Sequence, residues 1–222
     1  MDRQDKFMIG SNRPLIPAID SRQTHDRPAI DTDLCMWENC CTFVVMMIQL
    51  RDINTADPCY PFVERLWVDS FPETERRDTL QQRKNTDANP VFHCVLAQQD
   101  GQPVGFMTYW DFDTFCYGEH FATDPALRNC GYGRQIFQAV LAHIARPFVL
   151  EVEMPEDEMS TRRIGFYKRN GMIIWSDIPY TQPAYRVGGE SLPMRLMATP
   201  GLQPEKDAAD IIRTIHRYVY GV

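Results

Sequence analysis

The sequence lacks any Cys-x-x-Cys pair and any histidine at the spacing of a zinc ligand, although it contains seven cysteines. Their number is odd and they are scattered along the chain, unlike the framework of a disulfide-stapled protein. Cys94 and Cys116 fall within apolar runs, where a reduced thiol behaves as a small hydrophobic group. We therefore expect no metal site and a reducing, cytoplasmic environment.

Long hydrophobic runs are also missing. The longest, residues 43–48, is far too short to span a bilayer. The amino end does not show the charged, then apolar, then small-residue order of a secretory signal. The sequence thus predicts no membrane partner.

An excess of positive charge is absent too. The 23 lysines and arginines are outnumbered by 30 aspartates and glutamates, which gives a net charge of −7. A nucleic-acid interface needs a clustered basic face, so we expect no nucleic-acid partner. An acidic surface suits a cationic acceptor such as an amine, and solubility explains it equally well.

What is present suits one soluble domain with a full core. The chain has 222 residues, of which 44% are hydrophobic and 24% charged. Residues 1–41 carry three prolines and many charges without periodicity, which predicts a poorly ordered extension ahead of a domain at 42–222. No internal repeat is visible.

Hydrophobic periodicity predicts a mixed α/β domain. Apolar stripes at 60–71, 136–144 and 211–219 indicate helices, and a short polar helix is expected near 73–83. Ser160 can cap a further helix that ends at Asn170-Gly171. Asp100-Gly101 between two apolar runs predicts a hairpin, and 179–193 reads as an irregular connection. Strands are expected at 44–52, 93–97, 104–109, 115–123, 148–152, 172–175 and 194–197.

The most informative motif lies between the fourth predicted strand and the next helix. It reads Arg-Asn-Cys-Gly-Tyr-Gly at residues 128–133. Glycines at a helix start leave backbone N–H groups bare, the helix dipole favours anions there, and flanking arginines neutralise phosphate. The motif is too short for the lysine-bearing P-loop and lacks the dinucleotide spacing. A simple tight turn is the alternative. The candidate phosphate ligands are Arg128, Asn129, Cys130, Gly131, Tyr132, Gly133 and Arg134.

The segments that follow strengthen the phosphate interpretation. After the helix come an apolar strand at 148–152 and a second helix that ends in Gly165-Phe166-Tyr167 and, four residues later, Gly171-Met172. In order and spacing, residues 46–198 resemble the GCN5-related N-acetyltransferase (GNAT) superfamily. Its members carry an Arg/Gln-x-x-Gly-x-Gly/Ala loop for the coenzyme A pyrophosphate and a late tyrosine. The resemblance implies a mixed, mostly antiparallel central sheet of about seven strands flanked by helices.

The resemblance also assigns cosubstrate contacts and a general acid. In the family, backbone groups of the fourth strand, which separates from the fifth, hold the acetyl carbonyl and the pantetheine arm. Phe121, Ala122 and Thr123 occupy that segment here. Tyr167 occupies the position of a tyrosine that protonates the departing thiolate. A core tyrosine that anchors the helix is the alternative.

Two strand glutamates are candidates for the general base. Glu119 is the first choice, acting through a water, and Glu151 is the second. Strict alternation places Glu119 on the same face as Phe121 and turns His120, read as structural, the other way. A structural hydrogen bond or an exposed strand face remains open for either glutamate.

Several positions depart from the family pattern or lie outside it. Many members carry an asparagine seven residues before the tyrosine, whereas this chain has Ser160, which is more safely a helix cap. Gly165 costs roughly 1 kcal/mol within a helix, which close passage of the coenzyme or tight packing would explain. We expect residues 110–112 and 180–185 to line the acceptor cleft, with an aromatic surface patch as the alternative.

The resemblance implies an N-acetyltransferase that takes acetyl-CoA as cosubstrate. A primary amine, on a small molecule or a peptide, would attack directly in a ternary complex. One rival is an acyl-CoA-binding sensor or interaction module that kept the fold and lost turnover. A second rival is transfer of a longer acyl group. A homodimer stays open, and the sequence does not name the acceptor.

The resemblance begins at Met46, which suggests that the upstream segment is a misassigned start or a dispensable tail. We expect a chain shortened to begin at Met46 to fold, bind acetyl-CoA and melt at about the same temperature as the full chain, because a poorly ordered segment adds no packing. Calorimetry on both chains measures this. A large loss of stability would show that the segment packs on the domain.

Overall fold

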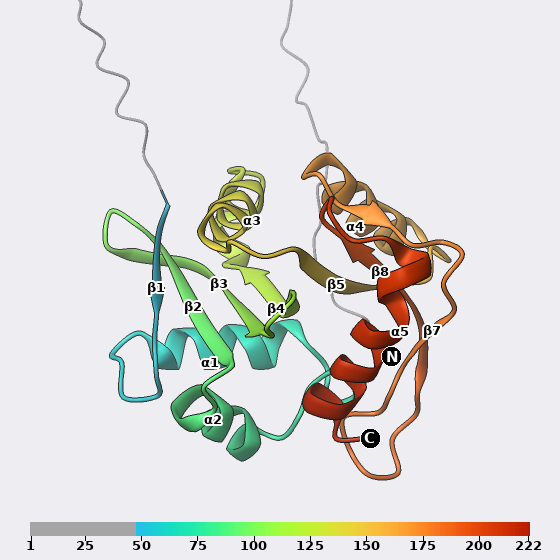
Figure 1. Cartoon of the computed structure of the whole chain (residues 1–222). Coiled ribbons are helices and arrows are strands. Elements are labelled where there is room, and N and C mark those ends of the chain that lie inside the picture. Colours follow the sequence, from blue (N-terminus) through green and yellow to red (C-terminus); the bar gives the residue numbers. More distant parts are fainter. Residues whose placement is uncertain (1–47) are drawn as a thin grey trace, which may run out of the picture.

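The computed structural model describes residues 48–222. The predicted extension at 1–41 and the first part of the predicted strand at 44–52 lie outside the described residues. Within them, eight strands form one sheet in the order β1-β2-β3-β4-β5-β8-β6, and β7 pairs with β8 (Figure 1). The strands are β1 (Gln49–Asp52), β2 (Phe92–Gln99), β3 (Gln102–Asp111), β4 (Cys116–Thr123), β5 (Phe148–Glu153), β6 (Ile173–Ile174), β7 (Tyr180–Gln182) and β8 (Leu192–Ala198).

Helices cover both faces of this sheet. In Figure 1, α3 and α4 lie on one side, and α1 and α2 lie on the other. Every sheet pairing is antiparallel except that of β4 with β5, which confirms the predicted mixed, mostly antiparallel architecture. The helices are α1 (Tyr60–Ser70), α2 (Thr79–Ala88), α3 (Tyr132–His143), α4 (Glu158–Arg169) and α5 (Pro204–Ile215), with short turns η1 (Glu73–Glu75), η2 (Pro125–Leu127) and η3 (His216–Tyr220).

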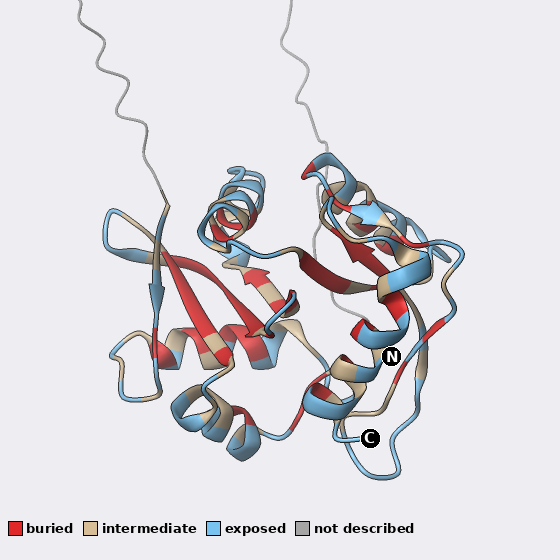
Figure 2. Cartoon of the chain, viewed as in Figure 1, coloured by how far each residue is buried: buried red, intermediate tan, exposed pale blue. Residues whose placement is uncertain are grey.

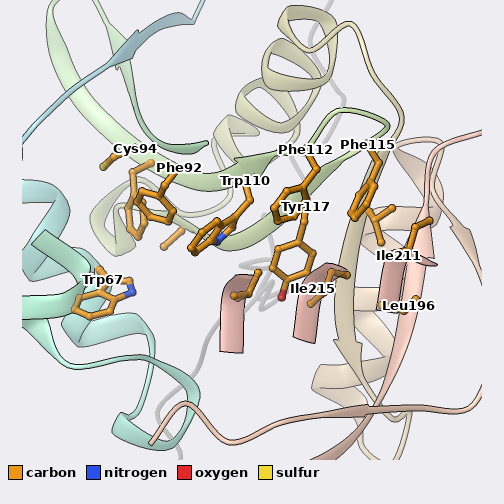
Figure 3. Close-up of a cluster of buried hydrophobic side chains, with 14 of the residues drawn as sticks. Trp67, Phe92, Cys94, Trp110, Phe112, Phe115, Tyr117, Leu196, Ile211 and Ile215 are labelled. Carbon is orange, nitrogen blue, oxygen red and sulfur yellow. The ribbon is translucent and has the colours of Figure 1, made fainter. Parts of the chain in front are cut away.

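The sheet separates two apolar cores, and buried residues concentrate on its central strands (Figure 2). On one face, Trp67 of α1 and Ile215 of α5 join Trp110 and Tyr117 of the sheet (Figure 3). On the other face, α3 and α4 pack against β3, β4 and β5. The apolar stripes that predicted these helices are the surfaces they bury.

The hairpin between β2 and β3 turns where the sequence predicted it. Asp100 has φ 51° and Gly101 has φ 76°, so both residues are left-handed. This is the backbone that a two-residue hairpin with the native strand twist requires, and it explains the Asp-Gly pair.

The parallel pairing of β4 with β5 is short. It contains three residue pairs, of which the last is Gly118 with Leu150, and the strands then diverge (Figure 1). A Cβ atom at Gly118 would lie 2.4 Å from Cζ of Phe148, a ring that is 1% exposed. A glycine is therefore needed where the strands separate, since any larger residue would displace a buried ring.

A β-bulge in β4 reverses one prediction from the sequence. Thr108 pairs with His120 and Tyr109 pairs with Gly118, so Glu119 is the extra residue. His120 consequently packs against Trp67 on the α1 face, together with the Glu119 side chain. Phe121 packs in the opposite core. The expectation that Glu119 shares a face with Phe121 and that His120 points the other way is wrong, because the bulge breaks the alternation.

Three local expectations also change. Asp157, rather than Ser160, is the N-cap of α4, and Ser160 is its partner in a reciprocal capping box. The predicted polar helix at 73–83 divides into η1 and α2. The connection at 179–193 contains β7, whose three residues are too few to give a periodic signal.

Candidate active site

A cleft of about 1570 Å³ opens where β4 and β5 separate. It lies between the last turn of α1 and the inner side of α4, and all three predicted catalytic residues and the predicted strand segment line it. The main contributors from the sheet and α4 are Tyr117, Glu119, His120, Phe121, Ala122, Thr123, Glu151, Gly165, Phe166 and Tyr167.

The predicted phosphate loop precedes α3. Gly131 is the N-cap, with φ 78°, and no side chain caps the helix. Asn129 has φ 64°, so two residues of this turn are left-handed. The first amides of α3 are thus left for an anionic group, which fits a coenzyme pyrophosphate. Arg128 lines the cleft, whereas residues 129–134 are outside its lining.

The α4 wall of the cleft carries charges of both signs and has a gap at Gly165. Its arginines are Arg162, Arg163 and Arg169, of which Arg162 pairs with Glu158 and Arg163 with Glu153. The nearest atom to a Cβ built at Gly165 is Nη1 of Arg169 at 3.1 Å, the far end of a flexible side chain. Packing therefore does not demand a glycine here, and the space it leaves opens into the cleft.

Tyr167 lies on the same wall. Its ring is 5.2 Å from that of Phe137 and 5.2 Å from that of Phe166. Burial raises the pKa of its hydroxyl above the ordinary value, against a smaller opposing effect of Arg163. Among the described residues, no hydrogen-bond partner is found for this hydroxyl. A protonated hydroxyl that faces a cleft is available to donate to a bound group.

Glu119 is held in a buried ion pair. Arg77 binds it through both guanidinium ends, with Nη1 2.9 Å from Oε2, and the side chains are 2% and 0% exposed. Trp110 Nε1 and the Tyr185 hydroxyl also donate to it, at 3.2 and 3.1 Å. Burial opposes ionisation of the carboxyl, but the charge of Arg77 and hydrogen bonds from His120 and Arg77 outweigh it and hold the pKa well below its usual range.

Glu151 lies on the same face of the sheet, and within residues 48–222 it forms no ion pair with a lysine or arginine. Its Oε2 accepts a hydrogen bond of 2.9 Å from the Tyr220 hydroxyl, and its Oε1 accepts one from Tyr180. Burial raises its pKa to about 7, although hydrogen bonds from Tyr180, Tyr220 and Tyr117 favour the charged form. This carboxyl changes charge in the neutral range.

Sequence reasoning missed the partners that distinguish these two glutamates. Arg77 lies in a polar stretch without periodicity, so nothing marked it as buried. Tyr220 follows an apolar stripe that predicts a closing helix and gives no sign of a polar contact. Tyr180 and Tyr220 lie far apart in the sequence, and only the fold brings their hydroxyls to Glu151.

The expectation that residues 110–112 line the acceptor cleft is wrong, because none of them is in its lining. Trp110 and Phe112 are 3% and 8% exposed and pack in the α1 face core, and Asp111 pairs with Arg146. From 180–185, Gln182 and Tyr185 do line the cleft.

Within residues 48–222, no cluster of histidine, cysteine, aspartate and glutamate has the arrangement of a metal site. Over the same part of the chain, no helix combines the length and apolar character that crossing a membrane requires.

Comparison with known proteins gives a family match over half the chain. A model of the acetyltransferase (GNAT) family matches residues 57–172. The chain is also similar to a solved structure assigned to the GNAT acetyltransferases from Bacteroides thetaiotaomicron. The two are 46% identical, with a TM-score of 0.76, over 78% of this chain and 99% of that one.

More distant solved structures share the fold. The ribosomal-protein-S18-alanine N-acetyltransferase from Escherichia coli is 17% identical, with a TM-score of 0.51 over 72% of this chain and 98% of its own. Naa50 from Arabidopsis thaliana, in complex with the bisubstrate analogue CoA-Ac-MVNAL, is 16% identical, with a TM-score of 0.51 over 69% and 99%. Among curated proteins, none matches this sequence.

The ion pair generates a stability prediction. Arg77→Met keeps most of the side-chain volume but leaves the Glu119 carboxylate buried and unpaired, which should cost about 3–5 kcal/mol of unfolding free energy at pH 7. Denaturant unfolding measures the loss. Because the pKa of Glu119 is lowered in the folded protein, the stabilisation of the wild type is lost as pH falls.

Arg83→Met is the matched control, since Arg83 pairs with Glu64 on the surface. Solvent screens that pair, and unfolding should change little. Equal destabilisation by both substitutions would contradict the structural importance of the buried pair.

Proposed function

The chain belongs to the acetyltransferase (GNAT) family, and on this basis we propose that it transfers an acetyl group from acetyl-CoA to a primary amine by direct attack in a ternary complex. The observation that carries the proposal is one cleft that joins separated strands, a carboxyl with a pKa of about 7 and a tyrosine, and that reaches Arg128, three residues before the N-cap of α3. Each of these meets one demand of acyl transfer to an amine.

The coenzyme would lie along the α3 and α4 side of the cleft. The amides at the start of α3, with Arg128, would hold the pyrophosphate, and the backbone of residues 121–123, which lies beyond the pairing of β4 with β5, would hold the pantetheine arm. The missing side chain at Gly165 leaves room beside them. Bound acetyl-CoA supplies the activated acetyl group as a thioester.

We propose Glu151 as the general base. An amine is protonated at neutral pH and must lose a proton before it attacks. A base with a pKa near 7 is well matched to this task, and Glu151 has that value and lines the cleft. Glu119 is less suited, because its carboxyl is fully buried and its proton affinity is low.

We propose Tyr167 as the general acid. A departing thiolate needs a proton, and a phenol donates one only if it remains protonated until that moment. The raised pKa keeps Tyr167 protonated, and its hydroxyl has no competing partner within the described part of the chain. Glu151 and Tyr167 come from opposite faces of the sheet, so they meet the reacting centre from two sides.

The α1 side of the cleft would receive the acceptor. Its lining includes Asp69, Glu75 and Glu151, whereas the cleft-lining arginines lie on α4 and at Arg128, where acidic residues accompany them. The acidic α1 side favours a protonated amine.

The direct experiment measures release of free thiol from acetyl-CoA in the presence of a panel of primary amines, both small molecules and peptides. Turnover with at least one amine is expected. Binding of acetyl-CoA with no turnover on any amine would favour the sensor module. Faster turnover with a longer acyl-CoA than with acetyl-CoA would show that the longer acyl-CoA is the preferred donor.

Glu151→Gln removes the base while keeping the shape of the side chain. With the best acceptor, wild-type kcat/KM should rise with pH through about 7, because Glu151 acts only when deprotonated. The variant should lose that limb and at least a hundredfold in rate, the usual scale of general base catalysis. Glu64→Gln, on the surface of α1, is the control. An unchanged limb in Glu151→Gln would reject this base.

Tyr167→Phe removes a proton donor and preserves ring packing on Phe137. We expect turnover to fall by roughly a hundredfold, with nearly normal acetyl-CoA affinity by calorimetry. Tyr60→Phe tests for a general cost of losing a buried hydroxyl, since Tyr60 is 5% exposed and lies outside the cleft lining. If Tyr167→Phe loses no more turnover than Tyr60→Phe, Tyr167 is a core tyrosine.

A further inference from the structure

The C-terminal turn of the chain contacts Glu151, a residue that lines the cleft. After α5, residues His216–Tyr220 form a π turn, and Gly221 ends it with φ 76°. Such wide turns are rare and often occur at functional sites. This turn brings residue 220 against β5, near the middle of the sheet, and it lies beyond the family match, which ends at residue 172.

The Tyr220 hydroxyl is held by more than one partner. It donates to Glu151 Oε2 at 2.9 Å, accepts from Gln182 Nε2 at 2.8 Å and lies 3.3 Å from the Tyr117 hydroxyl. Because Gln182 Nε2 is a donor only, the hydroxyl proton of Tyr220 is directed to the carboxylate. Its ring is 4.8 Å from that of Tyr185, which itself donates to Glu119.

We propose that Tyr220 is a positioning residue that fixes and tunes the carboxylate of Glu151, so that the C-terminal turn supports the amine site from behind the cleft lining. This inference rests on the proposed function of Glu151 as the general base. Tyr220 acts through Glu151 and touches no reacting atom.

The surroundings of Glu151 support this role. The groups around it are Tyr117 and Glu119 on β4, Tyr180 on β7, Tyr185 in the following loop, Leu196 on β8 and Tyr220 on η3. His216 contacts the rings of Tyr180 and Tyr220. The charge of Glu119 disfavours ionisation of Glu151, and Arg77 partly offsets it. The hydroxyl donors favour ionisation, so removal of one must raise the pKa of Glu151.

The test uses the full chain and two substitutions on the same turn. Tyr220→Phe removes only the hydroxyl. Tyr218→Phe is the matched control, because Tyr218 is 53% exposed and its ring contacts Phe112 and Arg217. The first measurement is an NMR titration of the Glu151 side-chain carboxyl, assigned with Glu151→Gln. The second is the pH dependence of kcat/KM.

For Tyr220→Phe, the Glu151 midpoint and the acid limb of kcat/KM should both move to higher pH. Activity should fall roughly tenfold at pH 7, as expected for a lost hydrogen bond to a charged group, and recover at high pH. Tyr218→Phe should change neither quantity. In the wild type, the ring resonances of Tyr220 should titrate with the Glu151 midpoint, which tests the contact even if the variant does not fold.

The outcomes separate the two proposals. The role of Tyr220 would be overturned if the titration midpoint of Glu151 were the same in Tyr220→Phe as in the wild type, whatever the activity. It would also be overturned if the wild-type Tyr220 resonances did not shift as Glu151 titrates. A midpoint that moves while the acid limb of kcat/KM stays fixed would instead overturn the assignment of Glu151 as base. An equal shift in Tyr218→Phe would also overturn the inference, because it would show a nonspecific effect of the turn.

Discussion

The separation of β4 from β5 is the constraint on which the cleft depends. The two strands form the single parallel pairing of the described sheet and stay together for three residue pairs. Phe148 leaves no room for a side chain at Gly118, and the next residue, Glu119, is a bulge. Beyond this point, within residues 48–222, β4 and β5 form no further ladder pairs, and the cleft opens between them.

The bulge also decides how two glutamates on adjoining strands can differ. Glu119 and Glu151 both face the α1 side, yet one is paired with a buried guanidinium and the other with tyrosine hydroxyls. The pKa of the first is lowered and that of the second is raised. Environment, more than residue type, separates a carboxylate that holds the fold from one that can exchange a proton near neutral pH.

Sequence patterns of neighbouring residues predicted most helices and strands. The features that these patterns missed depend on contacts between residues that are distant in sequence. The Asp100-Gly101 hairpin and the α3 stripe follow from neighbouring residues, and Tyr167 lines the cleft as its spacing indicated. The bulge depends on the register between two strands, and alternation cannot reveal it. The environment of Glu151 depends on Tyr220, 69 residues away, which no pattern near either residue encodes.

The loop between β7 and β8 has one further consequence. Tyr185 ties it to Glu119 and the Arg77 guanidinium, whereas Val187, two residues on, is fully exposed. Arg186 adds a second contact, an ion pair of 3.1 Å with Glu73. The loop is therefore anchored at the cleft, while the Val187 side chain is left to solvent. Under the proposed function, substitutions at this exposed position can change which acceptors are favoured over evolutionary time without disturbing the hydrogen bonds of Glu119.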